Sequence, residues 1–385
     1  WAALETLLSE IAHLSHKDWH VTGINSDRMA RLLLPDNDNG REDGGGLTTE
    51  QSRQMFERIL HEGNWDGALE HARNSMNNKR NGNSSNDKPW AVLVTGVNGI
   101  RKTTSIYQPW FSEVLREALV APPSACSEGE DYETNFPLEV LPHGGNSFFR
   151  QLDHMITTLC NEHFSMLYAL TAAQLECSGN TNNANEAADR DNNNPPPKEL
   201  IKQYSNLKAG IFSRYRTLSE LLGVLLLKEA QREKMNAMCE TSGRDVAMFH
   251  YIDHFFSPER YNKLALHFTI NDLGCAMRSV DERMVREMET GREALASGDV
   301  VNVIYANAGG PYGSEVLEGV QADSERVWDT MVLNGGDDDD GGVGGDWYKA
   351  TMRINASVDK PWTIQAVCPD GSLGKEYTFG DPRNV

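Results

Sequence analysis

The chain has 385 residues, of which 39% are hydrophobic and 24% charged, and it carries a formal net charge of −20 at pH 7. This length suits two or three domains, or one enlarged α/β domain with appendages, and the composition is that of a globular protein with polar tracts. The acidic balance argues against broad binding to nucleic acid or to an anionic membrane, because phosphates are repelled on average.

Polar stretches divide the chain into three predicted regions. Residues 1–76 are expected to form a helical N-terminal region with linkers, 88–333 the core, and 346–385 a small β-rich extension that alternates polar and apolar residues. Within the core, the Asn- and Pro-rich residues 178–197 cannot bury enough apolar surface to offset the entropy of ordering. We therefore interpret them as a disordered insertion.

The core alternates predicted strands and helices. The apolar run at 90–96 predicts a buried strand, and a helix follows at 103–119 that Pro109 kinks or divides. Further elements are expected as strands at 136–142, 235–241 and 263–270, and as helices at 148–175, 198–234 and 270–295. Alternating β and α units predict an α/β fold with a mostly parallel sheet flanked by helices.

The segment Gly96–Thr104 directly follows the first core strand and opens a predicted helix. This is the setting of a phosphate-binding loop, in which glycines let backbone N–H groups converge on phosphate oxygens at a helix N-terminus. The simpler interpretation is an ordinary glycine-containing turn, and we favour the nucleotide site. The predicted nucleotide-binding residues are Gly96, Asn98, Gly99, Arg101, Lys102, Thr103 and Thr104.

Three neighbouring residues of this loop carry distinct predictions. Lys102 is expected to reach the β- and γ-phosphates, and Thr103 to supply a hydroxyl to Mg²⁺. Arg101 stands where the phosphate-loop pattern has its second glycine. A side chain there either strains the loop and shifts Lys102, or adds a second cation to the phosphate site.

A polar segment follows the strand predicted at 235–241. Ligands bind doubly wound sheets at the carboxyl ends of their strands. We therefore predict that Glu240 holds Mg²⁺ or its water shell, and that Thr241 or Asp245 touches an acceptor molecule. Arg244 is expected to pair with a phosphate. The same segment also suits a helix N-cap, and the two interpretations are compatible.

The helix predicted at 270–295 carries Arg278, Arg283 and Arg286 interleaved with carboxylates. A lid helix that closes its arginines over a transferring phosphate excludes water and neutralises developing charge. The alternative is a surface helix laced with i,i+4 ion pairs. Beside a phosphate loop we favour the lid, with Arg278 and Arg283 as catalytic residues.

Two further patterns carry weaker signals. The Gly-rich residues 307–313 either line an acceptor pocket or form a turn, and we favour the turn. His250, Asp253 and His254 are spaced like metal ligands, but no further ligand cluster is evident, so we assign no metal to them.

The loop resembles the GxNGxGKTT of signal-recognition-particle GTPases, although no guanine-specifying motif follows it. The order of later motifs is similar to that of zeta-toxin-like small-molecule P-loop kinases. Phe149-Arg150 enters a helix, Glu240-Thr241 ends a strand, and an Arg-bearing lid helix follows, over roughly residues 88–295. The resemblance implies a P-loop kinase-like core that uses ATP, with GTP less favoured, and Mg²⁺. It also implies a substrate-binding role for Arg150.

The resemblance fails at the acid/base aspartate of that family. The matching positions here are Gly145, Asn146 and Ser147, so the toxin reaction on a nucleotide sugar is not carried over. Asp153, one helical turn further on, is the replacement base that we predict, and a solvated helix residue is the alternative. We expect an ATP-dependent phosphotransferase that acts on an unidentified small acceptor. The alternative is a non-catalytic or weakly hydrolytic nucleotide-binding regulatory protein.

Cysteine spacing and apolar runs bear on location. The six cysteines form no CxxC pair, which favours reduced thiols over a disulfide framework or a zinc site. No apolar run is long enough to span a bilayer, and the acidic, amphipathic start is not typical of a signal peptide. We therefore expect a cytoplasmic protein without a membrane or nucleic-acid partner. The sequence names no protein partner.

Overall fold

The computed structural model describes residues 57–80, 88–120, 140–180, 198–333, 347–357, 360–367 and 372–379. Most of the predicted N-terminal region, most of the predicted insertion and the acidic linker before residue 346 lie outside these residues. The phosphate-loop segment and every predicted site residue lie within them.

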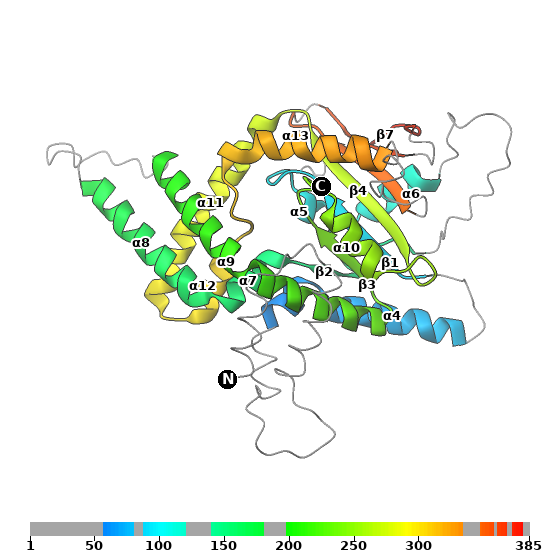
Figure 1. The fold of residues 1–385 in the computed structure, drawn as a ribbon, viewed down its shortest axis with the longest axis horizontal. Helices are drawn as coiled ribbons and strands as arrows, with labels where there is room; N and C mark the ends of the chain where they lie inside the picture. The colour runs from blue at the N-terminus through cyan, green and yellow to red at the C-terminus, as the bar shows by residue number, and fades with distance from the viewer. Residues whose placement is uncertain are drawn as a thin grey trace, which may run out of the picture.

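The described strands form one seven-stranded sheet in the order β2-β3-β1-β4-β5-β6-β7 (Figure 1). All pairings among the first five strands are parallel, whereas β6 and β7 pair antiparallel. This confirms the predicted α/β class with a mostly parallel sheet. The strands are β1 (Trp90–Thr95), β2 (Ser147–Arg150), β3 (Asn236–Glu240), β4 (Asn262–Ile270), β5 (Trp347–Ile354), β6 (Trp362–Ala366) and β7 (Tyr377–Phe379).

Helices flank the sheet, and a helical lobe containing α8, α9 and α11 extends to one side of it (Figure 1). The helices are α4 (Trp65–Arg80), α5 (Lys102–Ile106), α6 (Phe111–Val120), α7 (Leu152–Leu159), α8 (Asn161–Asn180), α9 (Lys198–Arg232), α10 (Ala247–Phe255), α11 (Leu273–Ser297), α12 (Val300–Ala306) and α13 (Leu317–Val327). A 3₁₀ turn (Ser314–Val316) precedes α13, and a π-helical segment (Trp328–Leu333) follows it.

The central strand β1 is buried on both faces. Val92 and Val94 belong to one hydrophobic cluster, and Ala91 and Leu93 belong to another on the opposite face. A parallel strand covered on both sides needs a continuous apolar run, which explains why WAVLVT contains no polar residue before its last position.

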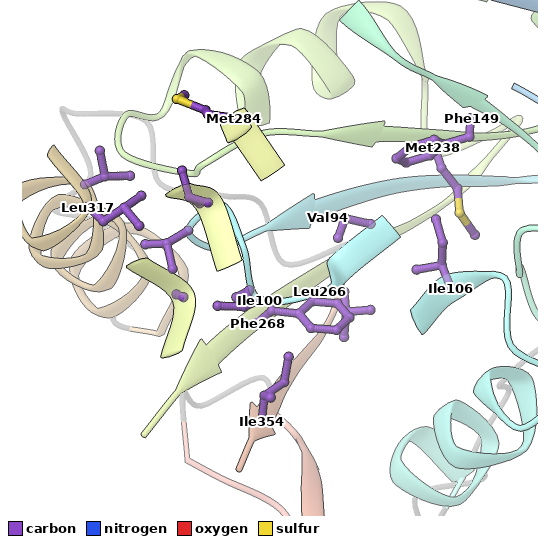
Figure 2. Close-up of a cluster of buried hydrophobic side chains, with 14 of the residues drawn as sticks. Val94, Ile100, Ile106, Phe149, Met238, Leu266, Phe268, Met284, Leu317 and Ile354 are labelled. Atoms are coloured by element: carbon purple, nitrogen blue, oxygen red, sulfur yellow. The ribbon is translucent and has the colours of Figure 1, made fainter. Parts of the chain in front are cut away.

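The larger hydrophobic cluster anchors the segment after β1 (Figure 2). Ile100, which is 1% exposed, lies beside Phe268 of β4, and Ile106 of α5 is fully buried in the same cluster. Burying an isoleucine side chain contributes about 1.5–3 kcal/mol. The two isoleucines therefore hold the loop and α5 against the sheet.

Two predicted elements in the first half of the core differ from the structure. The strand predicted at 136–142 is wrong in its described part, since 140–142 are not in a strand and the second strand is Ser147–Arg150. The sequence instead predicts the start of a helix from residue 148, because periodicity cannot separate a short buried strand from a helical segment. The long helix predicted there is interrupted at Cys160, which has φ −131° and ψ 37°.

Other boundaries agree with the sequence predictions. Pro109 separates α5 from α6, as one of its two expected effects. The strands predicted at 235–241 and 263–270 are confirmed as β3 and β4, and the helices predicted at 198–234 and 270–295 as α9 and α11.

The two ends of the described chain pack on the core. β5 pairs with β4 from Trp347 to Ile354, so the predicted β-rich extension includes a strand of the central sheet. At the other end, the ring of Trp65 on α4 lies 4.9 Å from that of Phe148 on β2. Across the described part of the chain, every helix is too short or too polar to cross a lipid bilayer.

Candidate functional site

Two glycines shape the turn that follows β1. Gly96 has φ 124° and Gly99 has φ 84°, conformations that favour glycine. A Cβ atom on Gly96 would lie 2.3 Å from the carbonyl oxygen of Phe268, and one on Gly99 would lie 2.5 Å from that of Ala276. The loop is therefore held closely between β4 and α11, with no room for side chains at these two positions.

The backbone donors of this loop have few partners. The N–H groups from Val97 to Thr104 donate no well-formed hydrogen bond to another element among the described residues. Successive N–H groups of this kind form an anion-binding concavity. Because α5 spans only Lys102–Ile106, its dipole adds less than the continuous helix predicted from the sequence. An anion bound here would be held chiefly by the loop N–H groups and by nearby side chains.

The Lys102 side chain is buried within the loop. Its Nζ donates to the carbonyl oxygens of Gly96 and Val97, both at 2.7 Å, and lies 3.2 Å from Oε1 of Glu240. Burial lowers the pKa of Lys102, and the Glu240 carboxylate opposes that shift. Thr103 Oγ1 donates to Oε2 of Glu240 at 2.6 Å.

The register of the sheet explains why Glu240 lies beside Lys102 and Thr103, which are distant from it in the sequence. β3 lies beside β1, with Val94 opposite Glu240, so the end of β3 reaches the start of the loop. The structure therefore brings together Lys102, Thr103 and Glu240, which the sequence analysis had selected separately.

Arg101 occupies a glycine-like conformation, with φ 60° and ψ 27°. The left-handed region costs a non-glycine residue about 1–2 kcal/mol. The Arg101 side chain is exposed, and no carboxylate among the described residues forms an ion pair with it. The loop thus holds Arg101 in a conformation that glycine adopts freely, at a cost in strain.

Replacing Arg101 with glycine is expected to raise the free energy of unfolding by up to about 1 kcal/mol, because relief of strain exceeds the entropy gained by the unfolded chain. Urea denaturation measures this change. Lys234→Gly is a matched control, since Lys234 also has a positive φ of 57° but lies two residues before the amino end of β3, remote from the loop. Both variants should have a higher free energy of unfolding than the wild type. A lower value for Arg101→Gly would contradict the inference that Arg101 is strained.

Asp153 approaches the loop from the first turn of α7. A Cβ atom on Gly310 would lie 3.4 Å from Nδ2 of Asn98 and 3.6 Å from Oδ2 of Asp153. Burial raises the pKa of Asp153, while the positive charges of Lys208 and Arg283 oppose the shift. The predicted base and the predicted loop residue Asn98 therefore lie close to the same backbone.

Of the three predicted lid arginines, Arg283 is the one directed at this cluster. Its Nη2 donates to the carbonyl oxygen of Gly310 at 3.1 Å, and its side chain is 18% exposed. Arg278 is 66% exposed and pairs locally with Cys275 and Asp272, and Arg286 is also exposed. With 3.6 residues per turn, positions five apart do not share a helix face, which separates Arg278 from Arg283.

Arg150 lies elsewhere. Its guanidinium forms a buried ion pair with Glu220 and lies 5.1 Å from the ring centroid of Tyr251. Alternation along β2 directs Phe149 toward the larger hydrophobic cluster, and Arg150 toward the face that contains Cys239 and α10. The structure therefore gives Arg150 a place in the core and does not bring it to the loop.

Of the residues after Glu240, Thr241 and Asp245 make local hydrogen bonds, whereas Arg244 contacts another segment. Thr241 Oγ1 accepts from the N–H of Gly243 at 3.3 Å, and Asp245 Oδ1 accepts from that of Ala247 at 3.0 Å. These are turn contacts between residues two apart. The N-cap of α10 is Val246, which has no side-chain cap, so the predicted N-cap is wrong. Arg244 is exposed, and its guanidinium carbon lies 5.4 Å from the ring centroid of Tyr312.

The sequence analysis missed a buried ionic group next to the site. Glu287 Oε2 accepts from Lys208 Nζ at 2.5 Å and from Tyr204 Oη at 3.0 Å. Its Oε1 accepts from the N–H of Ala308 at 3.0 Å. The detectable signal was Lys208 itself, because it shares a helix face with Tyr204 and Phe212 at four-residue spacing. A charge within an apolar stripe predicts a buried partner.

Comparison with protein-family models, with curated proteins and with solved structures finds no match to this chain. Within the described residues, no group of three or more His, Cys, Asp or Glu side chains is arranged to hold a metal ion. The role of this site is therefore argued from its own residues and geometry.

A buried histidine borders the loop on the β4 side. His267 Nδ1 and Thr95 Oγ1 share a hydrogen bond at 2.8 Å, and the imidazole stacks on Trp328 at 4.8 Å. Burial lowers the pKa of His267 from its ordinary value of 6.5 to about 3, and Lys102 adds to this shift. His267 is therefore neutral in the folded protein at neutral pH.

This histidine predicts a loss of stability in acid. The unfolded chain binds a proton at His267 below pH 6.5, whereas the folded chain does not until about pH 3. The free energy of unfolding should fall in this window by about 1.4 kcal/mol per pH unit from this group. Urea denaturation between pH 7 and pH 4.5 should show a shallower decline for His267→Gln. The exposed His250→Gln should decline as the wild type does, and equal slopes for all three proteins would contradict the prediction.

Proposed function

We propose that this protein is a phosphotransferase that binds a Mg²⁺-nucleoside triphosphate at Gly96–Thr104 and transfers the terminal phosphoryl group to a small acceptor. The observation that carries the proposal is the row of N–H groups from Val97 to Thr104 at the end of β1, which donate no hydrogen bond to another element within the part of the chain that the structure describes, with Lys102 inside the loop. Convergent backbone donors beside an ammonium group are suited to a polyphosphate.

The strand order supports the same location. From β1 the chain passes to β2, which lies toward one edge of the sheet. Later it passes from β3 to β4, which lies toward the opposite edge. Ligands of open α/β sheets bind outside the carboxyl ends of the strands, where the direction of the connections reverses. The loop after β1 lies at this point.

Two oxygen atoms fit a role toward Mg²⁺. Thr103 Oγ1 and Glu240 Oε2 lie 2.6 Å apart beside the loop. Protein sites commonly hold Mg²⁺ through one or two such oxygens together with substrate phosphates. When bound, the ion supplies charge neutralisation on the phosphates. Thr103 and Glu240 are the residues that would hold it or its waters.

Asp153 and Arg283 supply the remaining chemistry in this proposal. An acceptor hydroxyl donates its proton to the Asp153 carboxylate as its oxygen attacks the terminal phosphorus. The bond from that phosphorus to the bridging oxygen breaks, and the nucleoside diphosphate leaves with this oxygen. The raised pKa of Asp153 brings the carboxylate nearer to the strength that a general base needs at neutral pH. Arg283 lies beside Asp153 and neutralises negative charge on the phosphoryl group in transit.

A second candidate function is nucleotide binding without transfer. Lys102 already has three acceptors in Gly96, Val97 and Glu240, so phosphates have to compete with these contacts. The strained Arg101 adds a second departure from the phosphate-loop pattern. Both observations favour a weakly hydrolytic, regulatory nucleotide-binding protein as the alternative.

Transfer of a labelled γ-phosphate separates these candidates. The full chain is incubated with Mg²⁺ and labelled ATP over a panel of sugars, nucleosides, nucleotides and small metabolites, with unlabelled GTP as competitor. A labelled acceptor that disappears in Lys102→Ala supports the phosphotransferase. Nucleotide binding without transfer to any panel member supports the regulatory candidate. Absence of nucleotide binding contradicts both.

A further inference from the structure

The segment from Asn307 to Gly313, which we call the wall, passes close to Asn98 and Asp153 at Gly310. Its first residues are fixed by buried contacts. Arg58, from the helical stretch before α4, donates through Nη2 to the carbonyl oxygen of Asn307 at 2.9 Å. The N–H of Ala308 donates to Glu287, which is fully buried. The start of the wall is therefore held from two separate parts of the fold.

The rest of this wall is fixed as well. The carbonyl oxygen of Gly310 accepts from Arg283 at 3.1 Å, and that of Pro311 accepts from Ser205 Oγ at 2.9 Å. The N–H of Gly313 donates back to Ser205 Oγ at 3.0 Å. A backbone pinned along its length loses little freedom when a ligand binds, which is the requirement for a preorganised recognition surface.

Tyr312 extends this wall toward the end of β3, where it meets Arg244. The guanidinium lies 5.4 Å from the ring centroid, a cation–π distance. Such a contact holds the planar group in place while its N–H edges stay available to donate. Arg244 is exposed, so these donors face solvent.

Arg244 differs in its charge environment from Lys102, Lys208 and Arg283. It shares its exposure with Arg101, but its guanidinium is positioned over the ring of Tyr312. Lys102 is paired with Glu240, whereas Lys208 and Arg283 both lie near Glu287. Among the described residues, no carboxylate forms an ion pair with Arg244. In a chain of net charge −20, an unpaired and positioned guanidinium is suited to attract an anion that the rest of the surface repels.

We propose that Arg244 and Tyr312 recognise an oxyanion, a phosphate or a carboxylate, carried by the acceptor. This inference rests on the proposed function and narrows its substrate class to anionic small molecules. The placement favours the acceptor over the nucleotide, because Tyr312 is two residues from Gly310, which borders Asp153. The loop that we propose for the nucleotide contains Lys102 instead, whose Nζ donates to the carbonyl oxygen of Gly96.

Calorimetric titration of the full chain, saturated with Mg²⁺-ADP, tests this assignment. The probes are matched sets that differ in charge: glucose, glucose 6-phosphate and gluconate; ribose and ribose 5-phosphate; adenosine and AMP. At least one charged probe should bind tenfold or more tightly than its neutral partner. The phosphate and carboxylate members of the glucose set distinguish the two oxyanions.

Variants of single residues show which side chains cause the tighter binding of the charged probes. Arg244→Gln should reduce the affinity for the charged probe tenfold or more, and Tyr312→Ala should reduce it severalfold, whereas Tyr312→Phe retains the ring and most of the affinity. Arg232→Gln, a 70% exposed arginine at the end of α9, should bind as the wild type does.

Several results would overturn the assignment. Equal affinity within every matched set, no binding of any probe, or an unchanged preference in Arg244→Gln all contradict it. A preference that disappears in Lys102→Ala but survives in Arg244→Gln places the anion in the loop and also contradicts it. If Mg²⁺-ADP itself does not bind, the proposed function fails. Tight Mg²⁺-ADP binding without a charge preference overturns the Arg244 assignment alone.

Discussion

Lys102→Ala is expected to lower nucleotide turnover by about 10²–10³-fold, the usual effect of removing one positioned charge donor from the reacting group. The fold should survive, because Glu240 keeps its hydrogen bond from Thr103 and is 27% exposed to solvent. Steady-state phosphate release and the urea-denaturation midpoint, measured on the same preparation, separate the loss of function from a loss of structure.

Lys88→Ala is the matched control for this variant. Lys88 precedes the amino end of β1, opposite the loop, and its Nζ donates to the carbonyl oxygen of Pro258 at 2.7 Å. This variant should keep wild-type turnover. Wild-type turnover in Lys102→Ala would mean that the loop is not the nucleotide site.

Glu287→Leu is expected to lower the free energy of unfolding by about 3–5 kcal/mol, because it leaves the Lys208 ammonium buried without a counter-charge. Both side chains of this pair are 0% exposed, and their charged atoms lie 2.5 Å apart. The substitution also removes the acceptor for Tyr204 and for the N–H of Ala308. Chemical denaturation measures the loss.

A double variant shows whether the uncompensated charge is the cause. Lys208→Met combined with Glu287→Leu replaces the pair by apolar groups, which is often close to neutral, so most of the lost stability should return. Glu289→Leu, at an exposed position on the same helix, should change stability by less than about 0.5 kcal/mol. A double variant that is no more stable than Glu287→Leu would contradict this explanation. If Glu287→Leu fails to fold, a double variant that also fails to fold contradicts it.

The parts of the site that sequence analysis identified are encoded locally. The apolar run of β1, the glycines after it and the following lysine are contiguous, so strand, loop and helix start can be read together. Glu240 could also be predicted from the sequence, because it ends a second apolar run and parallel strands end at one edge of a sheet.

The parts that sequence analysis missed depend on contacts between distant segments. The hydrogen bonds that fix the segment at 307–313 come from Arg58, Ser205 and Glu287, which are distant from it in the sequence. The direction of each side chain on α11 also determines that Arg283 reaches the site and Arg278 does not. A pattern of charges on α11 does not show which face meets the loop.

The calorimetric titration of the full chain with Mg²⁺-ATP tests the central claim most directly. Backbone donors at the end of β1 and the Lys102 ammonium predict saturable binding at one site, weakened strongly in Lys102→Ala and unchanged in Lys88→Ala. Absence of measurable affinity for any Mg²⁺-nucleoside triphosphate would contradict the account.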